Sequence, residues 1–109
     1  MIRNNKQAEE ACRPGLKILG DFWTLYLIYT LKSGEKRFSQ MERDLEGINP
    51  TTLTNRLKRL ELEAIIYRTE ETKAKGSVVY GLTEKGRDII PIVKTMEKFA
   101  RKYLLIEEK

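Results

Sequence analysis

The stretch INPTTLTNRLKRL, residues 48–60, decides the fold. It carries three cations and no acid, and its leucines recur at Leu53, Leu57 and Leu60. On a helical wheel that advances about 100° per residue, Leu57 and Leu60 both lie within about 40° of Leu53. One apolar edge of this kind is typical of a helix that packs on a protein core along one side. The sequence therefore predicts a helix over residues 50–63 with its leucines buried.

A shorter helix is predicted just before it, over residues 39–46. Ser39 and Glu42 have the S-x-x-E spacing of a capping box, in which each side chain bonds a free amide at the start of a helix. The next helix has Asn49 as its N-cap and Pro50 in its first turn, where the missing N–H of proline costs nothing. Two helices joined by so short a turn indicate a helix-turn-helix.

The polar face of the second helix combines short hydroxyl and amide side chains near its start with cations behind them. Such a face suits a recognition helix, because short side chains reach base edges and basic ones bind phosphates. The candidates for base or near-base contacts are Thr51, Thr52, Thr54 and Asn55. The candidates for phosphate contacts are Arg56, Lys58, Arg59, Arg37 and Ser39. An amphipathic helix with a merely solvated basic face is the alternative for the same pattern.

Two β-rich runs follow the recognition helix, and the segment between them is cationic. The runs IIYRTEE and SVVYGLT are joined by TKAKG, which predicts a hairpin over residues 65–83. Lys73 and Lys75 lie in its tip. This hairpin is placed as a wing that reaches the DNA backbone or the adjacent minor groove.

The flanking segments predict one central helix and two terminal ones. The run DFWTLYLIYTLKSG is apolar nearly all round, so we expect it at the centre of the core, with Asp21 as its N-cap and Trp23 packed inside. An N-terminal helix over residues 8–19 is expected to be interrupted near Pro14.

The C-terminal helix is predicted over residues 84–105, with Thr83 as its cap and a kink or break near Pro91. Apolar residues at helical spacing run along it from residue 89 to residue 104. This stripe is longer than so small a core needs, so it indicates a partner as well as internal packing.

Composition excludes several classes of protein. The chain has 109 residues, a net charge of +5, one cysteine (Cys12) and no histidine, which predicts a single globular domain without zinc or histidine-dependent chemistry. It lacks the glycine-rich phosphate loops, an apolar run of about 20 residues and a signal peptide. We therefore expect no enzymatic activity, no cofactor and no metal, and a cytoplasmic, nucleoid-associated protein without a membrane anchor.

Almost the whole chain resembles the HxlR-type winged helix-turn-helix transcriptional regulators. The matching motifs are Cys12 close to a proline, ILGDFWTLYLI, RFSQMERDLEGINPTTLTNRLKRLE and YGLTEKGRDIIPIV. The chain departs from the family in Asp21 and Phe22, where a glycine and a lysine are frequent, and in a wing tip without prolines.

The resemblance implies a mainly α fold with a small β-hairpin, in which N- and C-terminal helices dimerise. It implies a homodimeric repressor or activator whose recognition helices enter successive major grooves of a pseudo-palindromic duplex. Some members sense oxidants through a cysteine that matches Cys12, and the terminal helices could enclose a small-molecule effector. The alternative function is a winged-helix protein-interaction module of a transcription assembly that reads no bases.

Overall fold

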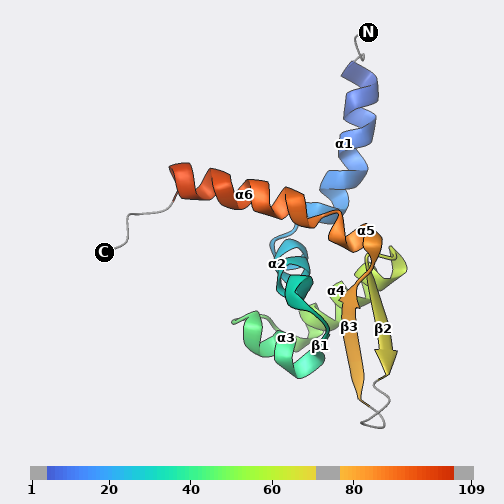
Figure 1. The fold of residues 1–109 in the computed structure, drawn as a ribbon. Coiled ribbons are helices and arrows are strands. Elements are labelled where there is room, and N and C mark those ends of the chain that lie inside the picture. Colours follow the sequence, from blue (N-terminus) through green and yellow to red (C-terminus); the bar gives the residue numbers. More distant parts are fainter. Residues whose placement is uncertain (1–4, 71–76, 105–109) are drawn as a thin grey trace.

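The fold is mainly helical, with one small antiparallel sheet (Figure 1). The computed structural model describes residues 5–70 and 77–104. The helices are α1 (Asn5–Leu19), α2 (Phe22–Thr30), α3 (Phe38–Asp44), α4 (Pro50–Leu62), α5 (Glu84–Arg87) and α6 (Ile90–Tyr103), with a 3₁₀ turn η1 (Leu31–Ser33) after α2. The strands are β1 (Lys36–Arg37), β2 (Ile66–Glu70) and β3 (Val78–Leu82). This order confirms the predicted fold class.

The core forms where α2, α3, α4 and the sheet meet. Its buried side chains are Leu27, Ile28, Leu31, Met41, Leu45, Ile48, Leu53, Leu57, Leu60, Ile65, Ile66, Leu82 and Ile89. Trp23 is half-buried and packs against this cluster, as expected from the sequence. The prediction that α2 is surrounded by core is wrong for one side of it, because Phe22 is 67% exposed and Tyr26 is 38% exposed.

The sheet has three strands in the order β1-β3-β2, so β3 is central. The predicted hairpin is confirmed: β2 and β3 pair antiparallel, with Arg68 opposite Tyr80 and Tyr67 opposite Gly81. Strand β1 was not predicted, because two residues carry no period that a sequence pattern can reveal. It pairs Lys36 with Tyr80 across the free edge of β3, and this places the start of α3 beside the wing.

Two predictions about the helices need correction. The capping box of Ser39 and Glu42 is wrong: α3 begins one residue earlier, with Arg37 as its N-cap, and the Arg37 N–H donates to Gln40 Oε1 at 2.8 Å. The interruption of the first helix near Pro14 is also wrong, because α1 continues through it. This part of α1 is exposed, so water can reach the backbone carbonyl that a proline leaves without a partner.

The C-terminal region divides as expected at Pro91, which lies in the first turn of α6. Thr83 caps the short α5 by accepting the Gly86 N–H at 3.0 Å, and its hydroxyl lies 2.6 Å from the Ala64 carbonyl. The segment before α6 is therefore fixed to the end of α4.

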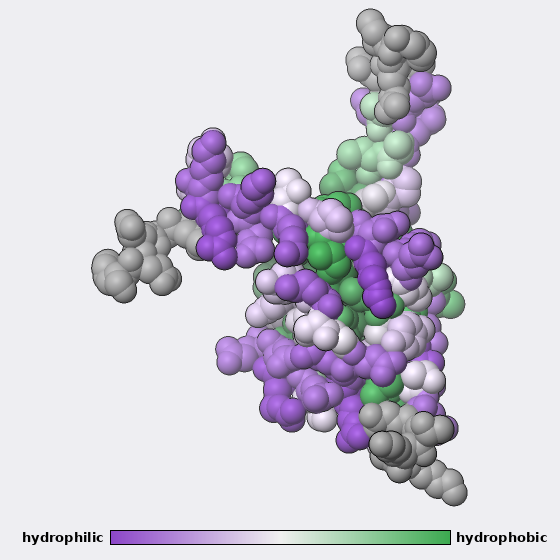
Figure 2. Space-filling view, in the orientation of Figure 1, coloured by the Kyte–Doolittle hydropathy of each residue, from purple (hydrophilic) through white to green (hydrophobic). Residues whose placement is uncertain are grey.

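Helices α1 and α6 project from the body as two arms (Figure 1). No residue of α6 is buried. Hydrophobic side chains gather on the surface where α1, α2 and α6 meet and along α1, whereas the surface over α3 is hydrophilic (Figure 2). In the part of the chain that the structure describes, none of the helices has the length and hydropathy to cross a membrane.

Candidate nucleic-acid interface

Helix α4 attaches to the body through the leucine edge predicted for it. Leu53, Leu57 and Leu60 are 0%, 3% and 1% exposed. The Asn49 side chain caps the helix by accepting the Thr51 N–H at 2.7 Å and the Thr52 N–H at 3.3 Å. Local chemistry and the apolar period thus fix where α4 starts and which side faces the core.

The opposite side of α4 is an exposed front formed by Thr51, Asn55, Lys58 and Leu62. Leu62 is 88% exposed, more than any other large hydrophobic residue in the described part of the chain. Thr52 and Thr54 lie at the margins of this front and are half-buried. The hydroxyl, amide and ammonium groups of this front are of the kinds that hydrogen-bond to the edges of base pairs.

A cleft of about 380 Å³ separates α4 from the sheet. Its lining residues are Phe38, Thr54, Leu57, Lys58, Glu61, Arg68 and Tyr80. Lys58 from α4 and Arg68 from β2 thus contribute cations to the same cleft, with Glu61 also in its lining. Sequence reasoning missed Arg68. The available signal was strand alternation, which places Arg68 and Tyr80 on the same face as the buried pair of Ile66 and Leu82.

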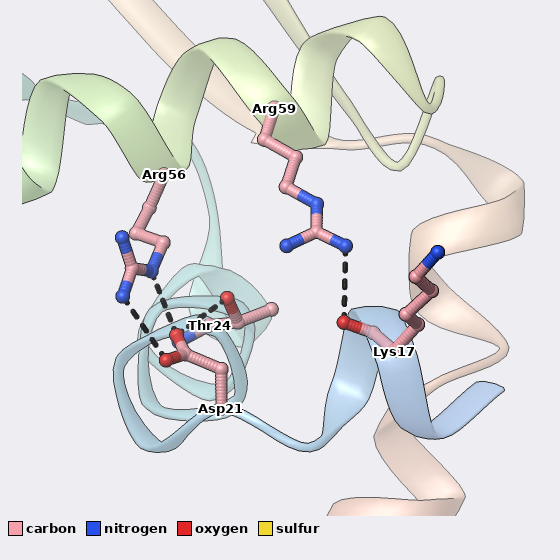
Figure 3. A network of polar contacts seen from close by, with 5 residues as sticks. All are labelled: Lys17, Asp21, Thr24, Arg56 and Arg59. Carbon is pink, nitrogen blue, oxygen red and sulfur yellow. Dashed lines mark hydrogen bonds and ion pairs between the residues drawn. The ribbon is translucent and has the colours of Figure 1, made fainter. Parts of the chain in front are cut away.

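Arg56 makes a two-pronged ion pair with Asp21 (Figure 3). Its Nε lies 2.7 Å from Asp21 Oδ2 and its terminal NH2 group lies 3.0 Å from Oδ1. Asp21 also caps α2 by accepting the Thr24 N–H at 2.9 Å. The hydrogen bonds from Arg56 are the largest influence that lowers the pKa of Asp21, from 3.8 to about 2.

Arg59 is bonded to the chain in the same region: its NH2 group donates to the Lys17 carbonyl at 3.0 Å. Arg56 and Arg59 were predicted to bind phosphates, and in this structure both guanidinium groups have partners within the protein. Lys58, which lies between them in the sequence, is on the exposed front. The phosphate contacts of all three stay predictions.

The pKa of Asp21 predicts how stability depends on pH. Because the folded pKa is lowered, the ion pair stabilises the protein fully above about pH 4 and loses this effect as the pH falls towards about 2. Since 29% of the Arg56 side chain and 30% of the Asp21 side chain are exposed, we expect a contribution of about 1 kcal/mol after solvent screening. Urea unfolding of the wild type and of Asp21→Asn should differ by this amount near neutral pH and converge in acid. A difference that is constant with pH would contradict the assignment.

The remaining predicted contacts are Arg37, Ser39, Lys73 and Lys75. Arg37 and Ser39 are exposed at the start of α3, close to β3 through the β1 pairing. Lys73 and Lys75 lie outside the described residues. In the described parts of the chain, no group of three or more His, Cys, Asp or Glu side chains is placed to hold a metal ion.

Comparison with known proteins agrees with this geometry. The family model described as HxlR-like helix-turn-helix matches residues 18–108. The chain belongs to this family. It is therefore a helix-turn-helix transcriptional regulator, a class that acts through DNA rather than through catalysis.

Known transcriptional regulators share sequence and fold with this chain. The HTH-type transcriptional regulator YvaP of Bacillus subtilis is 32% identical over 87 residues, which is 80% of this chain and 81% of YvaP. The reduced form of the regulator YodB from B. subtilis superimposes with a TM-score of 0.77 at 26% identity, over 98% of this chain and 100% of YodB. The redox regulator HypR in its reduced form has a TM-score of 0.77 at 32% identity, over 84% of this chain and 91% of HypR.

Cys12, the cysteine to which the HxlR resemblance gives a sensing role, is exposed on α1. It lines an apolar hollow of about 640 Å³ between α1, α2 and α6. The other lining residues include Leu16, Leu19, Phe22, Leu25, Ile92 and Met96. The thiol thus lies on α1 and borders an apolar surface.

Proposed function

We propose that this HxlR-like regulator binds a specific pseudo-palindromic duplex as a homodimer, with α4 as the recognition helix. The exposed, acid-free front of α4 is the observation that carries this proposal. Thr51 and Asn55 are exposed there and have the donors and acceptors that base edges match. Thr52 and Thr54 at the margins contact bases or the sugars beside them.

The DNA backbone is assigned to cations on either side of this front. Lys58 and Arg68 share the cleft between α4 and the sheet, which suits a phosphate of the strand that leaves the major groove at this point. Arg37 and Ser39 at the start of α3 bind phosphates on the other side. Lys73 and Lys75, which lie outside the described residues, are also assigned to the DNA backbone.

The two arms of the molecule provide the dimer interface in this proposal. Along α6, Ile92 is 47% exposed, Met96 51%, Phe99 56% and Tyr103 64%. Helix α1 carries exposed Leu16 beside the same apolar hollow. A second copy of the chain would cover both faces, as the HxlR resemblance implies.

Asn55→Ala tests whether the front of α4 reads bases. The first step is to select duplexes from a random-sequence pool with the wild-type protein. Asn55→Ala should then weaken binding to the selected duplex by about 1–3 kcal/mol more than it weakens binding to random duplexes. The reason is that a lost pair of amide hydrogen bonds to adenine affects only the cognate site. Lys58→Ala is the contrasting variant and should weaken both kinds of duplex alike. If Asn55→Ala weakens binding to both kinds of duplex equally, Asn55 positions the protein on the DNA and does not read bases.

The rival function is a winged-helix module that binds protein and reads no bases. Protein interfaces are depleted in lysine, whereas Lys58 lies in the middle of the exposed front. A selection that enriches no duplex motif would favour the rival over the present proposal.

We also propose that oxidation of Cys12 alters DNA binding. Two structural neighbours are regulators solved in defined redox states, and Cys12 is exposed as such chemistry requires. Diamide oxidises two thiols to a disulfide and takes up the two hydrogens that they release. Because the chain has one cysteine, the two thiols would be the two copies of Cys12 in a dimer. Diamide should change operator affinity in the wild type and leave Cys12→Ser unchanged. An equal response of both proteins would exclude Cys12 as the sensor.

A further inference from the structure

The corner where α1 ends and α2 begins receives two arginines from the recognition helix. Arg56 and Arg59 are three residues apart and extend from the same side of α4 towards this corner (Figure 3). Their partners, Asp21 and the Lys17 carbonyl, lie at the start of α2 and in the last turn of α1. Residues distant in sequence thus meet at one point of the fold.

Asp21 is held by four hydrogen bonds from two helices. Two come from Arg56, and two come from the Thr24 N–H at 2.9 Å and the Thr24 hydroxyl at 2.8 Å. A planar guanidinium paired in this way with a carboxylate fixes direction as well as distance. A phosphate that recruited Arg56 would have to displace this carboxylate, which stays ionised far below neutral pH.

Arg59 bonds an atom that α1 leaves available. Lys17 lies in the last turn of α1, where backbone carbonyls have no amide partner within the helix. A cation is also favoured at this end by the helix dipole. The contact ties α4 to the end of the projecting arm rather than to the body.

Hydrophobic packing decides which side of α4 faces the core, but it defines the direction of the helix axis less closely. The leucine edge holds α4 to the core, but burial of apolar surface has no preferred direction. The two arginine contacts supply directional bonds on one flank of the helix. They leave the front of Thr51, Asn55 and Lys58 on the exposed side.

We propose, on the basis of the DNA-binding function above, that Arg56 and Arg59 are positioning residues that clamp the recognition helix to the α1–α2 corner and bind no phosphate. The end of α1 then sets the angle at which α4 presents its front to the duplex. Asp21 and the Lys17 carbonyl are the fixed side of this clamp. DNA contact is left to the residues of the front, of the cleft, of the start of α3 and of the wing.

The effect of Asp21→Asn on operator affinity has opposite signs for a clamp and for a phosphate contact. A clamp predicts that operator affinity falls by roughly three- to tenfold, the size of a modest coupling in one ion-pair network, with an unchanged salt dependence. A phosphate role predicts the opposite, because Asp21→Asn frees a cation, tightens binding and steepens the salt dependence. The probe is the duplex that the wild type selects from a random pool.

Arg56→Gln and Lys58→Gln form a matched pair with the same loss of charge on the same helix. Lys58→Gln should reduce the slope of log affinity against log salt by about 1.8 per dimer, or about 0.9 for each phosphate. Arg56→Gln should lower affinity with the slope unchanged. A slope reduced equally by both would overturn the clamp. Arg56→Lys, which keeps the charge but not the two-pronged geometry, should lower affinity in the same way and is used if Arg56→Gln does not fold.

Hydrogen exchange without DNA keeps this inference separate from the proposed function. Amides of residues 56–62 should exchange faster in Asp21→Asn than in the wild type. Arg101→Gln is the control, because it removes a cation from an exposed ion pair with Glu97 on α6. If the wild type selects no duplex, the proposed function fails, and faster exchange in Asp21→Asn alone still supports the clamp. Unchanged exchange would overturn it.

Discussion

Operator binding by this regulator is expected to weaken by roughly 10³–10⁵ when the salt concentration rises from about 50 to about 200 mM. This range corresponds to roughly six to ten neutralised phosphates per dimer, each of which releases a condensed counterion. With Arg56 and Arg59 assigned to the clamp, the contributing side chains in each protomer are Arg37, Lys58, Arg68, Lys73 and Lys75. Two copies of this set reach the upper end of the range.

Fluorescence anisotropy of a labelled operator duplex across a series of salt concentrations measures this effect. Because a dimer that dissociates would also lose affinity, the oligomeric state has to be followed at each salt concentration. A random duplex of the same length is the control, and it should show a similar slope with a lower affinity. A flat titration would remove the electrostatic basis of the proposed function.

Replacing Met96 and Phe99 together by glutamate is expected to yield a monomer and to lower operator affinity by about 10²–10⁴-fold. Both side chains are more than half exposed on α6, and an acid at either position would remain charged inside an apolar interface. The loss follows from multivalency, because two linked recognition helices bind two half-sites with an affinity well above that of one. Light scattering gives the mass, and anisotropy gives the affinity.

Lys94→Glu is the control for this pair of substitutions. It introduces an acid on the opposite side of α6, where Lys94 is exposed, and should leave both the dimer and its affinity intact. Retention of the dimer in the Met96 and Phe99 variant would place the interface elsewhere. Loss of the dimer with unchanged affinity would show that one protomer suffices for recognition.

Local signals in the sequence were enough to predict most elements of the fold. The recognition helix follows from its leucine period, the cap of Asn49 and the placement of Pro50, and all three are confirmed. The caps of Asp21 and Thr83 are confirmed as well. Each of these depends on atoms within four residues, which a single sequence displays directly. At Ser39 the sequence allowed more than one helix start, and the pairing of β1 with β3 lies next to the one that forms. At Pro14 the helix could break or continue, and it continues where α1 is exposed.

The candidate site was predicted less completely. Strand β1 depends on its pairing with β3. The cleft that Arg68 shares with Lys58 depends on how α4 packs beside the sheet. The roles of the three cations in α4 could not be assigned either, because a position on the helical wheel does not say which groups from other elements lie opposite a side chain. The Arg56 guanidinium meets a carboxylate 35 residues away in the chain, and no local pattern encodes that distance.

The sequence by itself determined which side of α4 is apolar, which side lacks acids, and where α2, α4 and α5 start, because helical period and capping are short-range properties. Only the tertiary structure decided that the guanidinium groups of Arg56 and Arg59 have partners at the α1–α2 corner while Lys58 lies on the front, and that α6 buries none of its residues within one chain. The physical reason is that a hydrogen bond or an exposed apolar face is defined by what lies opposite it, and the folded chain alone supplies that neighbour.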